Sequence, residues 1–437
     1  IVGNSTYYRL GMPKPEDLTS VTLSPVNSAN ADEEVPQSVS YVFTYVSYYG
    51  EEGVNCDAEG AQIVDKHTDQ TVTLDFPPNP SGNYNFLYKR VYRTDAGGSY
   101  RFVQNVPIAQ DTFTDTVSDL NLREEIPTAN NDAPADDVTA DHKDGPLLGL
   151  VAMPNGILAG FSGQTVSFSE AFQPHAFPDE YKLTVKSDII ALSPLNTGLL
   201  VLTKGKPAIV QGLDPSSMSM MEIDSSLSCM SKRSVVDMGE FTIYSSPDGL
   251  VMATDSGLKL ITEQTFTRDQ WQAFGPSSIK GYLWEGQYIG FYSHGGVSKG
   301  FIFDPRGGKN GYTDLDFYAT AGYNDLEDDS LYLVVGGALV KFAEGSTPQN
   351  FVWRGKKFYT PRPINPAVAK VDCDGYSPNP TFKLYADGQL KHTQTVTNSN
   401  TFRLPSGYKA HEFEIELAGS VSVNEVCVYE SAEELGA

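Results

Sequence analysis

The segment FSEAFQPHAFPDEY carries the side chains best suited to chemistry, which are Glu170, His175, Asp179 and Glu180. Two carboxylates that flank a sugar bond can cleave a glycoside, and a nearby imidazole can move a proton. Pro174 and Pro178 explain the same segment as a rigid connection between strands. We favour the connection, and the sequence therefore predicts no catalytic residue.

Three acidic segments contain groups that metal ions bind. His142 lies beside Asp141 and Asp144, while DCDG at 372–375 and DLEDD at 325–329 offer oxygen ligands for calcium. The last two lack the spacing and the closing Glu of an EF-hand loop, and acidic runs are commonly solvated. We therefore expect acidic turns, with no metal site and no cofactor.

The cysteines give no sign of a redox or metal centre. They lie far apart and form no CxxC pair: Cys56, Cys229, Cys373 and Cys427. This spacing argues against a disulfide framework and against a metal held by thiolates. We expect reduced thiols that are mostly buried.

The charge excludes several classes of partner. The chain has 31 Lys and Arg against 55 Asp and Glu, a formal net charge of -24. Such a surface repels nucleic-acid phosphates and anionic membranes. No apolar run is long enough to predict a membrane span, and the beginning IVGNSTYYRLG lacks the features of a signal peptide. We expect neither sequence-specific DNA binding nor a membrane span.

Length and composition predict several β domains. A chain of 437 residues is too long for one ordinary core. With 39 Gly, 27 Pro and 24 Tyr, it is typical of a folded protein with many short strands and turns. We therefore expect an all-β protein of two or three domains.

Residues 13–127, after an N-terminal strap at 1–12, predict a fibronectin III-like β-sandwich. Its strand-like runs are at 38–50, 71–76, 85–94, 99–106 and 111–117. In YKRVYRT, Lys89, Val91 and Arg93 share one face, and the following AGG forms the hairpin turn. Residues 128–146 contain five Asp and few apolar side chains, which predicts an acidic linker or an extended strap.

The middle of the chain contains a repeat of strand, turn and strand. Five units cover 150–170, 189–212, 235–254, 279–304 and 318–345. Equivalent points at Ile157, Leu199, Ile243, Tyr288 and Tyr332 are 42, 44, 45 and 44 residues apart. This period is typical of blades, so residues 147–360 predict a divergent β-propeller, with 351–360 as a candidate for a further blade.

Two further predictions complete the fold. Residues 361–437 alternate at period two with DG and SG turns, which predicts a C-terminal β-sandwich. A short helix is expected only within 261–274.

A methionine cluster and a few basic residues are candidates for contacts between subunits. Five of the eight methionines are close together in the sequence: Met218, Met220, Met221, Met230 and Met238. Thioethers fill irregular cores and also adapt to partner surfaces, so both roles stay open, and the first three are the candidates for contact. Lys232 and Arg233 are candidates for pairing with an acidic neighbour.

Several runs carry a resemblance to a family. These are GLVAMPNGILAGFSGQTVSFSE, DPSSMSM, SCMSKRSVVDMG, YSSPDGLV, FTRDQWQAFGPSSIKGY and FRLPSGYKAHEFEIEL, which lie between residues 149 and 417. The chain resembles tailed-bacteriophage and prophage virion proteins, and within them the tail nozzle (tail tubular protein B-like) of short-tailed phages.

The resemblance implies a structural role without enzymatic activity. It implies a hexameric ring of copies of this chain that prolongs the DNA channel for genome ejection. The implied neighbours are tail proteins such as the adaptor, fibre or needle, and the implied location is the virion tail, assembled in the cytoplasm of the host bacterium. No catalytic residue is implied.

The acidity fits a channel, because a negative lumen repels DNA phosphates and lets the duplex slide without sequence-specific binding. Candidate channel or rim residues are Asp136, Asp137, Asp325, Glu327, Asp328 and Asp329. The alternative function is a tail component that binds or cleaves glycans at the cell surface.

Overall fold

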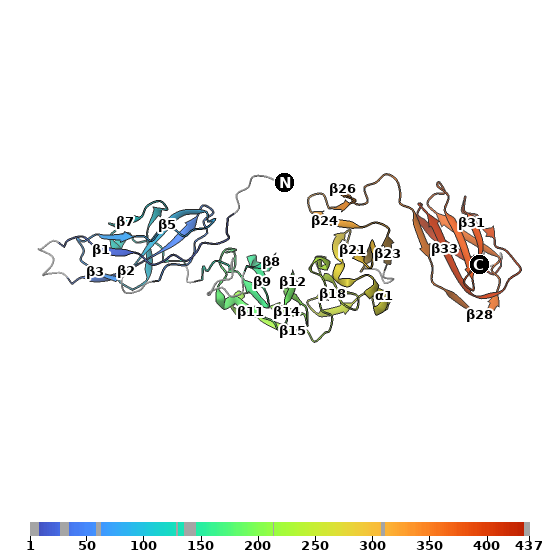
Figure 1. The fold of residues 1–437 in the computed structure, drawn as a ribbon, viewed down its shortest axis with the longest axis horizontal. Coiled ribbons are helices and arrows are strands. Elements are labelled where there is room, and N and C mark those ends of the chain that lie inside the picture. Colours follow the sequence, from blue (N-terminus) through green and yellow to red (C-terminus); the bar gives the residue numbers. More distant parts are fainter. Residues whose placement is uncertain are drawn as a thin grey trace. The chain divides into compact units, whose positions relative to one another are not determined.

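The computed structural model describes residues 8–26, 35–57, 63–127, 130–134, 146–212, 214–306 and 311–431. The chain divides into two compact units, residues 1–340 and 341–437. Antiparallel strands make up most of the regular structure in the described residues (Figure 1). The prediction of an all-β protein is therefore confirmed.

The N-terminal module, residues 8–127, contains two sheets. One has the order β1-β4-β7, with β1 (Ser20–Leu23), β4 (Val72–Asp75) and β7 (Thr112–Asp115). The other has the order β3-β2-β5-β6, with β3 (Ile63–Lys66), β2 (Gln37–Ser47), β5 (Phe86–Thr94) and β6 (Tyr100–Pro107). Both sheets contribute to one core, which includes Tyr41, Phe43, Leu74 and Val91. The short strands β1 and β3 were not among the predicted runs.

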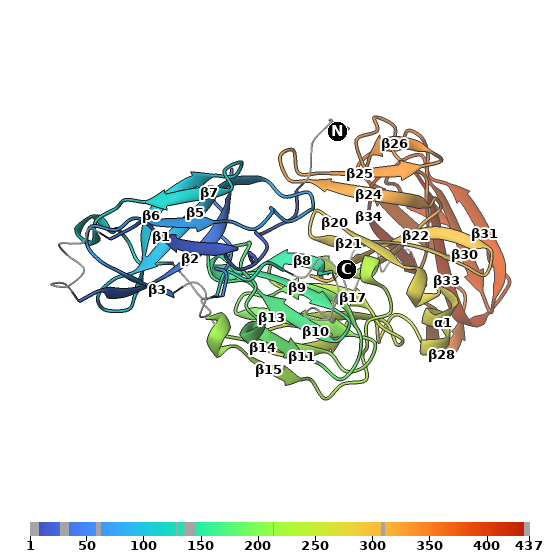
Figure 2. The same ribbon diagram turned by 60° about the vertical axis from the view of Figure 1, so that its left-hand side comes forward.

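The five repeat units each form a separate antiparallel sheet within the first unit (Figures 1 and 2). The first two sheets contain β8 (Leu148–Ala152), β9 (Leu158–Ser162), β10 (Thr165–Phe168) and β11 (Lys182–Thr184), then β12 (Ile189–Pro194), β13 (Gly198–Thr203), β14 (Ala208–Gln211) and β15 (Ser219–Glu222). The next two contain β16 (Val236–Asp237), β17 (Thr242–Ser245), β18 (Leu250–Thr254) and β19 (Gly257–Leu260), then β20 (Lys280–Trp284), β21 (Gln287–His294), β22 (Val297–Asp304) and β23 (Gly311–Leu315). The fifth contains β24 (Ala319–Asp325), β25 (Ser330–Val335) and β26 (Ala338–Lys341).

Apolar cores join successive sheets of the repeat. On β13, Leu199 and Val201 pack toward the first sheet, while Leu200 and Leu202 pack toward the third. A further core joins the third sheet to the fourth and includes Trp271. Because side chains alternate along a strand, a strand that is apolar at every position can be buried on both faces.

One short helix lies in the predicted segment 261–274. Helix α1 (Arg268–Ala273) begins with a capping box, in which Thr267 and Gln270 satisfy each other's backbone N–H groups. Single 3-10 turns occur at Asp119–Asn121, Pro154–Gly156, Asp179–Tyr181, Pro215–Ser217, Lys232–Ser234 and Pro276–Ser278. No helix among the described residues is long and apolar enough to cross a membrane.

The second unit contains two sheets around one core. The larger has the order β27-β33-β30-β31, and β28 also pairs with β33; these are β27 (Phe351–Arg354), β28 (Phe358–Ile364), β30 (Thr381–Ala386), β31 (Gln389–Thr395) and β33 (Ala410–Gly419). The smaller has the order β32-β29-β34, with β29 (Val368–Cys373), β32 (Phe402–Arg403) and β34 (Val423–Tyr429).

One boundary of the sequence analysis needs correction. Residues 351–360 were a candidate for a further blade of the middle region. Instead, β27 and β28 pair with β33 in the second unit. Alternating apolar residues identified these strands but could not identify their partner, because strand pairing is decided by contacts far away in the sequence.

Candidate assembly surfaces and groove

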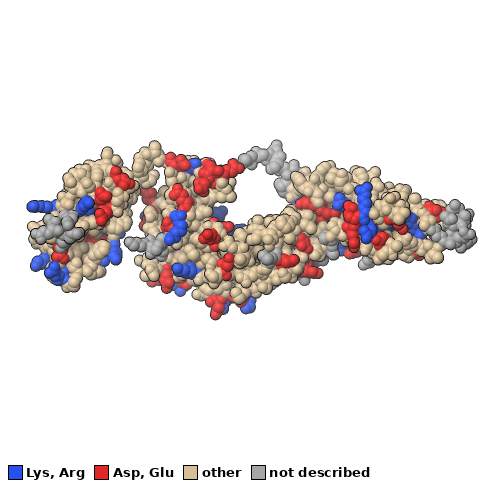
Figure 3. All heavy atoms as spheres, turned by 180° about the vertical axis from the view of Figure 1, so that it is seen from behind, with Lys and Arg blue, Asp and Glu red and all other residues tan. Residues whose placement is uncertain are grey.

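The acidic turn 325–329 joins β24 to β25 at the surface. The Asp325 carboxylate accepts a hydrogen bond from the Glu327 backbone N–H at 3.0 Å, and Asp328 accepts one from the Tyr332 hydroxyl at 3.1 Å. The side chains of Glu327, Asp328 and Asp329 are exposed. Figure 3 shows acidic side chains gathered at several places on one face, with Lys and Arg between them. The predicted positions Asp136 and Asp137 lie outside the described residues.

Lys232 and Arg233 lie in a 3-10 turn that leads into β16, and both are exposed. The next residue, Ser234, is buried and holds the turn through a hydrogen bond from its hydroxyl to the Ser231 carbonyl at 2.7 Å. The turn therefore presents two positive charges from a fixed backbone. This position is compatible with the predicted contact between subunits.

The methionines are divided between core and surface. Met218 is buried in the core between the first and second sheets, and Met220 packs against that core. Met221, the next residue on β15, is 62% exposed. Met218 therefore fills the core, while Met221 is exposed and can contact a partner.

The four side chains considered for catalysis have four different surroundings. Glu170 accepts hydrogen bonds from the Tyr181 hydroxyl at 2.9 Å and from the Asn130 amide at 3.1 Å. Asp179 forms an ion pair with Lys182 at 2.8 Å, and Glu180 is exposed. The His175 ring instead bonds the backbone of Glu52 in the N-terminal module.

The segment 168–181 forms hydrogen bonds with residues 130–134, which lie within the predicted linker. Besides the Asn130 contact, the Phe177 backbone N–H donates to the Asp132 carbonyl at 2.7 Å. Asn131 is 3% exposed, so this part of the linker is packed against the protein. The segment therefore acts as a docking site within the chain.

His175 should make folding sensitive to pH. Burial lowers the pKa of its imidazole below the ordinary 6.5, although the charges of Glu51 and Glu52 oppose this effect. Above about pH 6.5 both folded and unfolded chains hold a neutral imidazole; below it the unfolded chain takes up a proton that the folded chain resists. We expect the thermal unfolding midpoint to fall as the pH is lowered through this window. His175→Gln should reduce that dependence, while the exposed control His294→Gln should leave it unchanged.

The buried cysteines Cys56 and Cys229 are not activated nucleophiles. All four are thiols, and Cys56, Cys229 and Cys373 are buried. Burial raises the pKa of the Cys56 and Cys229 thiols to about 12, so both stay protonated near neutral pH. The described residues also contain no group of three or more His, Cys, Asp or Glu side chains placed to hold a metal ion.

A groove of about 590 Å³ lies in the second unit between β27 and the beginning of β34. Trp353 on one side is 47% exposed, and Leu417 is its partner across the β27–β33 ladder. The other side supplies Ser422, Asn424 and Glu425. The lining thus combines an aromatic ring with amide, hydroxyl and carboxylate groups, and the Asn424 amide donates to the Asp374 carboxylate at 2.8 Å. The sequence did not predict this groove, because the residues of its two sides are about 70 positions apart in the chain.

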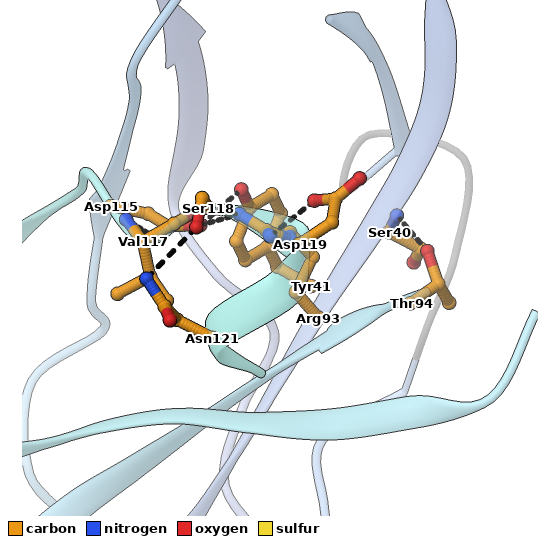
Figure 4. A network of polar contacts seen from close by, with 9 residues as sticks. All are labelled: Ser40, Tyr41, Arg93, Thr94, Asp115, Val117, Ser118, Asp119 and Asn121. Atoms are coloured by element: carbon orange, nitrogen blue, oxygen red, sulfur yellow. Dashed lines mark hydrogen bonds and ion pairs between the residues drawn. The ribbon is translucent and has the colours of Figure 1, made fainter. Parts of the chain in front are cut away.

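The N-terminal module contains a buried ion pair that the sequence analysis did not assign. The side chains of Arg93 and Asp115 are both fully buried and are in direct contact (Figure 4). Asp115 also accepts hydrogen bonds from the Tyr41 hydroxyl and the Val117 N–H, each at 2.8 Å. Arg93 contacts Asp119 at 2.6 Å. With its charge paired and its oxygens bonded, Asp115 is a structural group.

A second buried carboxylate, Glu52, is equally well bonded. It accepts hydrogen bonds from the Tyr92 hydroxyl at 2.6 Å and the Thr44 hydroxyl at 2.7 Å, and pairs with Arg90 at 2.6 Å. The alternation in YKRVYRT was one indication of these networks, because it placed the charged Arg93 on the same strand face as the apolar Val91. The acidic partners Glu52, Asp115 and Asp119 come from other segments of the chain, and the sequence pattern did not identify them.

No family model and no curated protein matches the chain. Among solved structures, the N-terminal domain of Nup159 is similar at 9% identity and a TM-score of 0.31, covering 45% of this chain and 61% of that domain. The surface component PorZ of the type-IX secretion system of Porphyromonas gingivalis is 10% identical with a TM-score of 0.31, covering 76% of this chain and 53% of PorZ. An exo-β-1,3-galactanase from Phanerochaete chrysosporium is 10% identical with a TM-score of 0.26, covering 90% and 100%. These values assign neither a family nor an activity.

Proposed function

We propose that this protein is a non-enzymatic component of a short-tailed phage tail, which forms a nozzle ring around the path of the DNA. The observation that carries the proposal is the set of sequence runs, from residue 149 to 417, that resemble nozzle proteins. Copies of the chain form the ring, and other tail proteins are its neighbours. The protein acts in the virion tail after assembly in the host cytoplasm.

The proposed architecture is a propeller between two sandwiches. Five successive antiparallel sheets, with apolar cores that join the first four, support blades, because a sheet with two apolar faces needs a neighbour on each side. Two sheets around a shared core support a sandwich in the N-terminal module and another in the second unit.

The net charge supports passage of DNA without binding. Like charges in the lumen would keep the phosphates away from the wall, so the duplex could slide. The exposed acidic side chains of the turn 325–329 are the proposed lumen or rim residues that the structure describes.

The mass of the purified assembly tests this proposal. We expect about six times the 47.6 kDa of one chain, measured by native mass spectrometry. Antibody labelling of intact virions should place the protein at the tail. A chain present as an isolated monomer in mature virions, or a lumen lined mainly by Lys and Arg, would contradict the proposal.

The groove beside Trp353 favours a second candidate, a tail component that binds glycans. Sugars present an apolar ring face together with hydroxyl groups, and the groove offers an aromatic ring beside Asn424 and Glu425. Titration calorimetry with soluble host polysaccharides distinguishes the two candidates. Binding that is lost in Trp353→Ala would support the second candidate.

A further inference from the structure

The fifth sheet of the repeat has fewer described strands than the others. The four preceding sheets have four strands in up-and-down order, whereas the described residues give this one three, in the order β24-β25-β26. Among the described strands, β26 is therefore the edge of this sheet. No described strand lies where each earlier sheet carries its fourth strand.

Three of the four residues of β26 are apolar, as in a strand that is buried by neighbours. At the same position in the earlier sheets, β10, β14 and β18 are largely buried, and β22 is buried or partly buried from Gly300 onward. On β26, by contrast, Leu339 is 70% and Val340 is 40% exposed, and Ala338 is also exposed. Apolar side chains on an unpaired edge form a template for another strand. The sequence of β26 thus suits a sheet that is completed in an assembly.

The surroundings of this edge are acidic. The turn 325–329 belongs to the same sheet, and Glu344 follows β26 and pairs with Lys341 at 3.1 Å. A complementary partner would be an apolar edge strand beside positive charges.

The second unit contains such a strand. β27 is the last strand of its sheet, and its Val352 is 71% and Trp353 47% exposed. Arg354 ends β27, and Lys356 and Lys357 follow it. Arg354 pairs with Glu414 at 2.6 Å and Lys357 pairs with Glu412 at 2.8 Å, so the exposed Lys356 is the candidate for contact with the acidic turn. β27 contains no proline, whereas β28 contains Pro361 and Pro363, which remove backbone donors.

We propose that β27 of one copy adds to β26 of the next copy and completes its fifth sheet. The two surfaces differ, so the contact runs head to tail, and such contacts close into a ring when the rotation from one copy to the next divides a full turn. The proposal names a contact within the nozzle ring and rests on that proposed function. With β27 parallel to β26, both strands end on the side of the turn 325–329, so the acidic turn of one copy lies near Lys356 of the other.

The variant Leu339→Lys tests the β26 edge, because a lysine on an edge strand opposes strand addition. The side chain is mostly exposed, so the fold should persist, with an unchanged thermal midpoint. Leu120→Lys is the matched control, since Leu120 is 97% exposed in the N-terminal module. By native mass spectrometry over a dilution series, we expect Leu339→Lys to associate at least about tenfold more weakly than the wild type and the control.

A charge exchange tests the identity of the partner. Glu327→Lys and Lys356→Glu should each weaken the ring, and the double variant should restore it. A ring that persists in Leu339→Lys overturns the contact and leaves the nozzle proposal intact. Loss of the ring in Leu339→Lys without an effect of Lys356→Glu overturns β27 as the partner. A wild-type chain that remains single at all concentrations overturns the ring itself.

Discussion

Replacing Asp115 by Ala should lower the free energy of unfolding of the N-terminal module by about 3–5 kcal/mol. The change leaves the guanidinium of Arg93 buried without its main partner, and it also removes the acceptor for the Tyr41 hydroxyl. All three tryptophans lie at Trp271 or beyond, so their fluorescence does not report on this module. Native-state hydrogen exchange of β2 and β5 is the suitable measurement.

Asp119→Ala is the matched control for that experiment. Asp119 contacts the same guanidinium, but its side chain is 51% exposed. Water can replace an exposed carboxylate, so a loss of at most about 1 kcal/mol is expected. Equal losses in the two variants would show that burial of the Arg93–Asp115 pair does not determine its contribution.

Trp271→Ala should destabilise the third and fourth sheets of the repeat by about 3–5 kcal/mol. The indole is fully buried, packs against Phe266 and Phe274, and donates its N–H to the Ser246 carbonyl at 2.8 Å. Its removal leaves a cavity and an unpaired acceptor. Hydrogen exchange of β17 and β21 should become faster, while β2 of the N-terminal module should be unaffected.

Trp271→Phe separates the two causes. Phenylalanine keeps most of the buried apolar surface but cannot donate to Ser246. We expect a smaller loss, of about 1–3 kcal/mol. A loss as large as that of the Ala variant would mean that the hydrogen bond, rather than packing, dominates this core.

The features that the sequence predicted are local. The turn 325–329 was expected between two strands of the fifth unit and lies there, and the helix within 261–274 follows from Thr267 and Gln270. Both depend on residues a few positions apart. The period of the repeat also predicted where each of the five sheets would be.

The features that the sequence could not predict join distant residues. The run at 351–360 reads as a strand, but nothing in it specifies pairing with β33 rather than with another blade. The sequence placed Arg93 on one strand face with Lys89 and Val91, yet its partner Asp115 is on β7. The Trp353 groove likewise forms only when β34 is in place. Each depends on which surfaces meet after folding.

The three buried thiols lie in three different cores. Cys56 is in the core of the N-terminal module, Cys229 between the second and third sheets of the repeat, and Cys373 in the second unit. A thiol reagent can react with each only when the surrounding structure opens. The chain therefore has one buried thiol in each of these three regions, and the labelling rate of each thiol reports how often its region opens. Their separate labelling rates would show whether one region opens before the others.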